Sequence, residues 1–337
     1  MAERLIKVVY PDQLVSRDYP ENYDLADKEY FYKEDFNYRV NNLHYIEIVN
    51  ASVVYHCVFE KLSIATTYCL HRPLSQLQVL RQYSKLLLYR SRKIDRAFLY
   101  VNEWGTNYFH WLTELFPIIV ATTNERNQYD GIIPHYYLRY AFIREGLEMF
   151  GLQLNTYQSR EKLVINKLRV CNQAQVGQYN IELLSMFKRQ IIGKIETENG
   201  IRRRIYVSRK MAHSRKILNE DSVIELLTEF KFQVIHFENL KFYDQVKLMM
   251  ESDFLISSHG AGLTNLMFMK TNSMVLELKA INNDFNCYFT LARVFNIKYY
   301  YQRCVSDDPN HRLANISVDL VELRKNIMLA ISSTFNP

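Results

Sequence analysis

Short apolar runs alternate with amphipathic segments throughout the second half of the chain. The apolar runs predict strands at 204–208, 233–237, 254–257, 274–278 and 298–302. The segments between them carry apolar residues at helical spacing and predict helices at 219–230, 242–251 and 284–295. Strands and helices that alternate at this pace are typical of βαβ units with a parallel sheet, which here indicates a Rossmann-like domain.

The first half has a less regular α/β pattern. It predicts strands at 52–59 and 96–101 and helices at 108–120, 139–150 and 181–195. We therefore expect an α/β protein with two Rossmann-like domains that face each other across a cleft, and with ligands near the carboxyl ends of the strands. The helical pattern breaks at Asn199-Gly200, so the expected boundaries are 1–198 for the first domain and 199–316 for the second. A last helix within 317–337, capped by Ser317, is expected to pack back toward the first domain.

Composition narrows the class of protein. Of 337 residues, 48% are hydrophobic and 23% charged, as in ordinary globular proteins, and a net charge of +6 indicates local anion binding rather than nucleic acid. The five cysteines lack C-x-x-C spacing, which argues against a disulfide framework or a structural zinc site. No apolar signal core or run of about 18 apolar residues is found, so we expect a cytoplasmic protein.

A glycine turn at the end of one predicted strand is the most informative feature. Strand 254–257 leads into a stretch that bends and then enters a short helix. Glycines permit the bend and a close approach of a ligand, and the first N–H groups of a helix suit a phosphate or diphosphate. The side chains of His259 and Thr264 would add donors beside the same anion. The candidate residues of this turn are His259, Gly260, Ala261, Gly262, Leu263 and Thr264.

Basic and acidic side chains follow the neighbouring strands. Arg209 and Arg215 are suited to bidentate contact with phosphate oxygens, although arginines of this kind also occur on solvated surfaces. His236 and Glu238 come just after a strand, where a ribose or base often docks; Glu238 is equally compatible with a solvated loop. Glu277 lies within an apolar strand and needs a partner, either a ribose or Arg209.

His110 and Glu114 stand out in the first half. They are spaced i and i+4, so they share one face of the predicted helix. A histidine and a carboxylate on one face form a plausible general base with its orienting partner. A buried structural histidine is the alternative.

Together these residues resemble glycosyltransferase family 61. The resemblance rests on Tyr206-x-Ser-Arg209, Arg215, Asn219-Glu220, Phe242-x-x-Gln245, Ser252-Asp253, His259-Gly-Ala-Gly-Leu-Thr-Asn265 with Phe268, Glu277, and Phe109-His110-Trp111 with Glu114. Relatives more often have Asp at the position of Glu114. The first ~95 residues carry no assignable resemblance.

The resemblance implies a GT-B fold and an inverting, metal-independent transfer of a sugar from a UDP-sugar, with no cofactor. Arg209, Arg215 and the turn at 259–264 would bind the diphosphate, Glu238 or Glu277 would lie near the uridine, and His110 and Glu114 would face the donor. The expected acceptor is a glycan or a lipid-linked oligosaccharide of a surface glycan, with peripheral membrane contact and no nucleic acid.

Two alternatives remain at this point. A nucleotide-dependent oxidoreductase would need G-x-G-x-x-G after its first strand, and the chain has only G-A-G late in its sequence. A non-catalytic nucleotide- or glycan-binding module on the same fold stays open.

Overall fold

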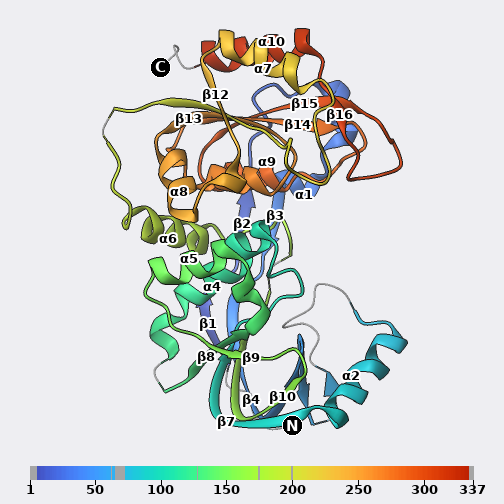
Figure 1. Cartoon of the computed structure of the whole chain (residues 1–337), viewed down its shortest axis with the longest axis vertical. Coiled ribbons are helices and arrows are strands. Elements are labelled where there is room, and N and C mark those ends of the chain that lie inside the picture. Colours follow the sequence, from blue (N-terminus) through green and yellow to red (C-terminus); the bar gives the residue numbers. More distant parts are fainter. Residues whose placement is uncertain are drawn as a thin grey trace. The chain divides into compact units, whose positions relative to one another are not determined.

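The computed structural model describes residues 6–61, 63–64, 73–126, 128–173, 175–198 and 200–333. Contacts divide the chain into two compact units. The first contains Met1–Gln13 and Arg39–Phe187, and the second contains Leu14–Tyr38 and Lys188–Pro337. Two residues of the sequence analysis lie outside the described residues: Cys69, one of the five cysteines, and Asn199, at the predicted domain boundary. Figure 1 shows the elements of both units, coloured from the N-terminus to the C-terminus.

The first unit is built on an eight-stranded mixed sheet. Its main path runs β6-β5-β4-β10-β7-β8-β9, and β1 pairs with β4. The strands are β1 (Ile6–Tyr10), β4 (Leu43–Val54), β5 (Cys57–Glu60), β6 (Ser63–Ile64), β7 (Arg90–Leu99), β8 (Asp130–Pro134), β9 (Asn155–Tyr157) and β10 (Glu161–Cys171). β7 is parallel to both β10 and β8, so its carboxyl end opens beside theirs.

The predicted strand at 52–59 is wrong, because the chain turns back within it. β4 and β5 form an antiparallel hairpin in which Val54 pairs with Cys57. Tyr55 takes a left-handed φ of 56° at the turn. The turn lacks glycine, proline and asparagine, so no turn signal marks this position in the sequence.

Helices of the first unit lie between and after the strands of its sheet. They are α2 (Gln76–Leu88), α3 (Tyr108–His110), α4 (Phe116–Ala121), α5 (Ala141–Met149) and α6 (Ile181–Ile192), which continues into the second unit. The predicted helix at 108–120 is confirmed, but its middle, Trp111–Leu115, is a π-helix. Phe116 joins three helices in one core, since its ring lies 5.3 Å from that of Phe150 and 5.1 Å from that of Phe187.

The second unit has a six-stranded sheet in the order β12-β11-β13-β14-β15-β16. Its strands are β11 (Arg203–Val207), β12 (Phe232–Ile235), β13 (Ser252–Ser258), β14 (Met274–Ala280), β15 (Lys298–Ser306) and β16 (Ile316–Ser317). The first five are parallel, and only β16 is antiparallel to its neighbour. Numbered along the chain, the parallel strands have the order 2-1-3-4-5 of a doubly wound sheet, which confirms the Rossmann-like prediction for this part.

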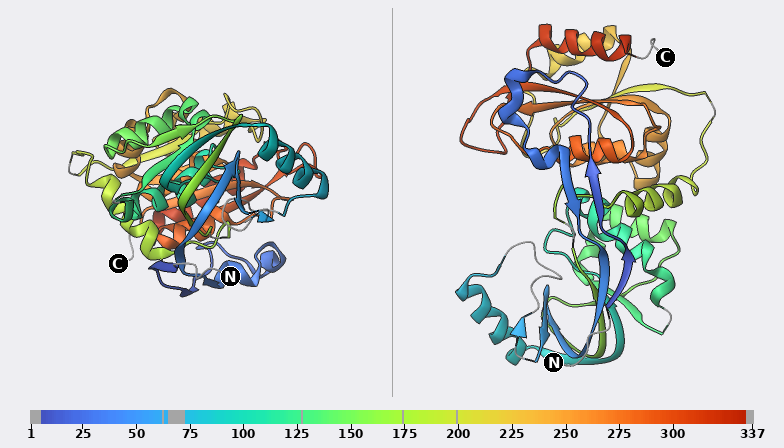
Figure 2. Two further views of the ribbon diagram at one scale, coloured as in Figure 1. Left: turned by 90° about the horizontal axis from the view of Figure 1, so that it is seen from below. Right: turned by 180° about the vertical axis from the view of Figure 1, so that it is seen from behind.

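Helices cover both faces of this sheet. They are α7 (Glu220–Glu229), α8 (Phe242–Met250), α9 (Cys287–Val294), α10 (Leu320–Ser332) and a 3₁₀ helix, Ala261–Phe268. Figures 1 and 2 show α7 and α10 on one face and α8 and α9 on the other. The short helix predicted after the glycine turn is thus 3₁₀ in form.

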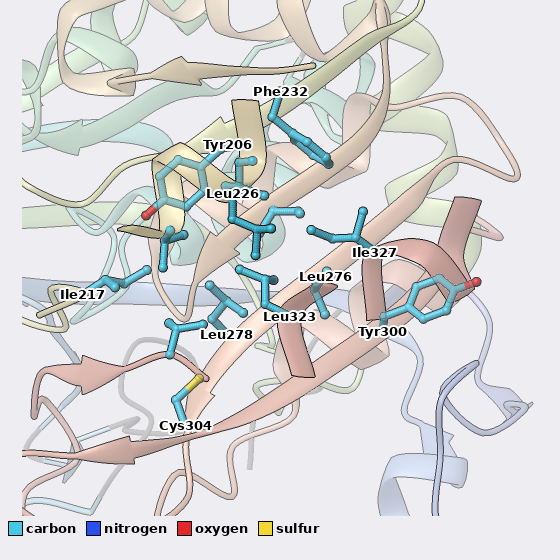
Figure 3. Close-up of a cluster of buried hydrophobic side chains, with 14 of the residues drawn as sticks. Tyr206, Ile217, Leu226, Phe232, Leu276, Leu278, Tyr300, Cys304, Leu323 and Ile327 are labelled. Carbon is cyan, nitrogen blue, oxygen red and sulfur yellow. The ribbon is translucent and has the colours of Figure 1, made fainter. Parts of the chain in front are cut away.

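The last helix packs on the core of the second unit. Leu323 and Ile327 of α10 belong to the same buried cluster as Leu226 of α7 and Leu276 of β14 (Figure 3). The cap is Asp319 rather than Ser317, and its carboxylate accepts hydrogen bonds from the backbone N–H groups of Val321 and Glu322. The apolar surface of α7 and the sheet would otherwise be open to water, which explains why α10 lies there.

An N-terminal segment contributes to the second unit. It contains α1 (Lys33–Phe36) and parts of the two-strand sheet of β2 (Gln13–Ser16) and β3 (Asn37–Val40). Asn22 donates to the backbone oxygen of Tyr301 at 2.7 Å, and Asn286 donates to that of Tyr30 at 3.0 Å. The predicted domain boundary at residue 198 places residues 14–38 in the first domain, whereas their contacts assign them to the second unit.

Candidate functional site

The predicted donor residues gather where β11 and β13 end. In a sheet with the order 2-1-3-4-5, the helices change face between strands 1 and 3, and ligands bind in the crevice at that point. Ser208 and Arg209 follow β11, while His259 and Gly260 follow β13. The topology therefore brings two separate sequence motifs to one edge of the sheet.

Gly260 lies directly against the guanidinium group of Arg209. A Cβ atom added to Gly260 would lie 2.1 Å from Nη1 and 2.7 Å from Cζ of Arg209. The φ of Gly260 is 175°, an extended value that any residue adopts, so the backbone itself does not require glycine. The space that we expected the glycine to leave for a ligand is filled by Arg209.

Arg215 lies close enough to Arg209 to influence its pKa. Burial and the neighbouring charge of Arg215 both lower the pKa of Arg209. Arg215 has a left-handed φ of 57°, which is uncommon for a residue with a side chain and is often associated with functional sites. Its backbone oxygen accepts a hydrogen bond of 3.1 Å from Ser258 at the end of β13.

Both arginines have unsatisfied donors. The Nε atoms of Arg209 and Arg215 are buried, and neither has a hydrogen-bond partner among the described residues. Arg209 does donate from Nη2 to the backbone oxygen of Ser214 at 3.1 Å. Two adjacent guanidinium groups with buried N–H groups left over are suited to an anion with several oxygens.

His259 is held by a buried carboxylate. Its Nδ1 is bonded to Glu277, and the second oxygen of Glu277 accepts a hydrogen bond of 2.5 Å from Tyr299. Burial would raise the pKa of Glu277, but the attraction of His259 and Lys279 and these hydrogen bonds outweigh it and hold the pKa below its usual value. An ionised Glu277 fixes the tautomer of His259, so that Nε2 is the nitrogen left to meet a ligand.

The partner of Glu277 is therefore neither Arg209 nor, by direct contact, a ribose. The carboxylate is completely buried, and both oxygens are used by His259 and Tyr299. Glu277 acts on the site through His259. The sequence showed that the carboxylate needed a partner, but not which of the surrounding side chains would supply it.

Residues after β12 complete this edge of the sheet. His236 has a buried Nδ1 without a partner among the described residues, whereas Glu238 is exposed. Gln245 braces the loop, since its Nε2 donates to the backbone oxygens of Phe237 and Leu240 at 3.0 and 3.1 Å.

Other residues of the family motifs are buried or form hydrogen bonds between structural elements. Thr264 and Asn265 are completely buried, and Asn265 donates to Gln245 at 3.2 Å. Tyr206 donates to Glu220 at 2.7 Å between the sheet and α7. Asn219 does not cap α7 with its side chain; the amide instead pairs with the backbone N–H and C=O of Val318, at 3.0 and 2.8 Å.

His110 and Glu114 form a fixed pair in the first unit. His110 Nδ1 lies 2.7 Å from Glu114 Oε1, and Asn102 donates to Oε2 of the same carboxylate at 2.8 Å. The Asn102 side-chain oxygen in turn accepts from the Trp104 N–H, and the Trp104 ring lies 4.7 Å from that of His110. The predicted i,i+4 contact is confirmed.

Asn102 was not anticipated as a site residue. It comes three residues after the carboxyl end of β7, which has a parallel strand on each side. Ligand-binding residues commonly lie at the carboxyl ends of such strands. That position was a usable signal. The π-helix at Trp111–Leu115 carries Glu114, and π-helical turns occur often at functional sites. A cavity of about 90 Å³ borders Asn102, Thr113 and Glu114.

Among the described residues, no three His, Cys, Asp or Glu side chains are grouped as a metal site. The second unit has cationic side chains and buried N–H donors at the end of its parallel sheet.

Comparison with known families decides between the broad classes. The family model described as Glycosyltransferase 61 matches residues 108–276, half of the chain. The chain belongs to this family. The matched region contains both the His110–Glu114 pair and the arginines and glycine turn of the second unit.

Characterised members of this family show related sequences. The EGF domain-specific O-linked N-acetylglucosamine transferase of Xenopus laevis is 37% identical over 108 residues, 31% of this chain and 20% of that protein. The corresponding enzyme of Drosophila melanogaster is 36% identical over 97 residues, 28% of this chain and 18% of that protein. The chain thus spans about a fifth of the length of these glycosyltransferase 61 relatives.

Proposed function

We propose that this protein is an inverting glycosyltransferase that uses a UDP-sugar without a catalytic metal. The observation that carries the proposal is the pair of Arg209 and Arg215, with buried N–H groups left over, at the switch point of a parallel sheet. A departing UDP develops negative charge on its diphosphate. The two guanidinium groups would stabilise that charge where a divalent cation does so in other enzymes.

The base is assigned to His110, with Glu114 as its positioning residue. Nδ1 of His110 donates to Glu114, so the lone pair of Nε2 takes the proton of the acceptor hydroxyl. The hydroxyl oxygen bonds to the anomeric carbon of the sugar, and the bond from that carbon to the β-phosphate oxygen breaks. UDP leaves, and the configuration inverts in this single displacement. The proposal requires a GT-B arrangement that brings the base to the donor.

N-acetylglucosamine is the first sugar to test, because the named relatives are N-acetylglucosamine transferases. For the acceptor we propose a glycan or a lipid-linked oligosaccharide of a surface glycan. The names of the relatives suggest an EGF domain as a second acceptor to test. A cytoplasmic location remains a prediction.

Matched substitutions test the reaction. His110→Gln and Glu114→Gln remove the base and its orientation, whereas His135→Gln alters an exposed histidine of the same unit. We expect sugar transfer from UDP-N-acetylglucosamine and other UDP-sugars to fall about 10²–10⁴-fold in His110→Gln, with UDP binding retained. His135→Gln should behave as wild type. Full transfer by folded His110→Gln and Glu114→Gln would refute the assignment, and UDP binding without transfer by wild type would favour a binding module.

A further inference from the structure

Helix α2 carries apolar residues on two faces, one that packs on the sheet and one that is exposed. Its inner face carries Tyr83 and Leu86, which pack with the buried cluster of Val54, Cys57 and Phe59 in the hairpin of β4 and β5. Its outer face carries four exposed leucines. Their exposed fractions are 58% for Leu77, 66% for Leu80, 82% for Leu87 and 81% for Leu88.

These leucines form one continuous stripe. Positions 77, 80, 84, 87 and 88 fall on one side of an α-helix within about 100° of arc, with Ser84 in the middle. The stripe is not needed to stabilise the start of the helix, because Ser75 and Gln78 form a capping box at its N-terminus. The outer face is therefore an addition to a helix that is already anchored by its inner face. α2 lies apart from α4 and α5 in all the views (Figures 1 and 2).

The sequence that contains the stripe carries charges of a single sign, while Glu161 of the neighbouring strand pairs with Arg92 at 2.7 Å. From Lys61 to Ile94 the sequence contains no aspartate or glutamate, while every charged residue is Lys or Arg. Arg81 is exposed next to the stripe, and Arg90 and Lys93 are exposed on the strand that follows α2. Lys85 lies one turn along from Arg81, with its Nζ 5.1 Å from the centre of the Tyr55 ring.

We infer that the outer face of α2 docks on the surface of an anionic lipid bilayer. Leu77, Leu80, Leu87 and Leu88 enter the boundary between headgroups and acyl chains, and the neighbouring cations bind lipid phosphates. Exposed leucines beside lysine and arginine are the pattern of interfacial helices that lie in the membrane plane. None of the described helices is long and apolar enough to cross a bilayer.

Charge separates this partner from the other candidates. A second copy of the chain would bring two cationic faces together, which is unfavourable. Nucleic acid would satisfy the cations but leave the leucines in water. An anionic bilayer satisfies both, and the inference does not depend on the proposed reaction.

Vesicle flotation tests the inference with the full chain. The probes are vesicles of phosphatidylcholine alone and of phosphatidylcholine with phosphatidylglycerol at roughly 7:3, a mixture that supplies an anionic surface. The double variant Leu87→Ser/Leu88→Ser removes two leucines of the stripe. Its matched control is Leu14→Ser/Leu25→Ser, whose leucines are 85% and 81% exposed in the second unit.

Wild type should float with the anionic vesicles and not with the neutral ones. Leu87→Ser/Leu88→Ser should reduce the partition coefficient at least about tenfold, because each leucine loses its apolar transfer into the interface. The control should match wild type, and circular dichroism should show that both variants are folded. Arg81→Gln/Lys85→Gln should weaken binding at least about tenfold, and added salt should weaken wild type.

Three results would overturn the inference. These are equal binding of wild type to neutral and anionic vesicles, equal losses in the stripe variant and its control, and self-association in solution that Leu87→Ser/Leu88→Ser abolishes. The last result would assign the stripe to a second copy of the chain.

Discussion

The absence of a side chain at Gly260 leaves the space that the guanidinium group of Arg209 occupies. Since Arg209 occupies the space where a Cβ would be, Gly260→Ala forces the guanidinium group to move. We expect UDP affinity to fall about ten- to a hundredfold, the effect of losing a charged hydrogen-bonding group of about 1.5–3 kcal/mol. Isothermal titration calorimetry measures it.

Gly262→Ala is the comparison in the same turn. Its added Cβ would lie 3.2 Å from a ring carbon of Phe237 and would not displace Arg209. A modest loss of thermal stability with near-normal UDP affinity is expected. Equal affinities of Gly260→Ala and wild type would show that the position of Arg209 does not govern binding.

His56 gives the first unit a pH-dependent stability. Burial, with a smaller effect of Lys85, lowers the pKa of His56 from 6.5 to about 4. Below pH 6.5 the unfolded chain binds a proton that the folded protein refuses until about pH 4, so stability is present above 6.5 and is lost as pH falls. The loss over this window is about 3 kcal/mol.

Denaturant unfolding between pH 7 and 4 measures this loss. His56→Gln should remove about one proton from the pH slope, and His135→Gln should leave it unchanged, because His135 is exposed. An unchanged slope in His56→Gln would contradict the assignment.

At the residue scale, the sequence predicted which residues belong to the candidate site, but it did not predict the contacts between their side chains. The positions of Arg209, His259 and His110 at the ends of strands or on a helix face were visible from spacing. That Arg209 fills the space beside Gly260, and that Glu277 is bound to His259, depends on side-chain packing across the sheet. Spacing along the chain carries no information on such packing.

At the scale of elements, Asn219 joins the start of α7 to the segment before α10. Asn219→Ala would leave the buried N–H and C=O of Val318 without their partner. We expect a loss of about 2 kcal/mol in the free energy of unfolding. Ser222→Ala, at an exposed position in the first turn of α7, should change it by less than about 0.5 kcal/mol. Equal effects of the two substitutions in chemical denaturation would refute the bracing role.

The second unit was predictable at this scale, and the first only in its helices. Strands of a buried parallel sheet are continuous apolar runs, and amphipathic helices separate them, so β11 to β15 could be read directly from the pattern. The hairpin at Tyr55 and the return of residues 14–38 to the second unit have no local signal. Both depend on contacts between distant residues.

At the scale of the molecule, the central claim is that a cationic site in the second unit binds UDP without a metal. Calorimetric titration of UDP in the presence and absence of EDTA measures this directly. The matched variants are Arg209→Gln and Lys210→Gln, since Lys210 is the adjacent exposed cation and pairs only with Asp221, at 3.7 Å, among the described residues.

We predict that wild type binds UDP equally with and without EDTA, that Arg209→Gln weakens binding about ten- to a hundredfold, and that Lys210→Gln has no effect. Loss of UDP binding in EDTA, or normal binding by Arg209→Gln, would contradict the account.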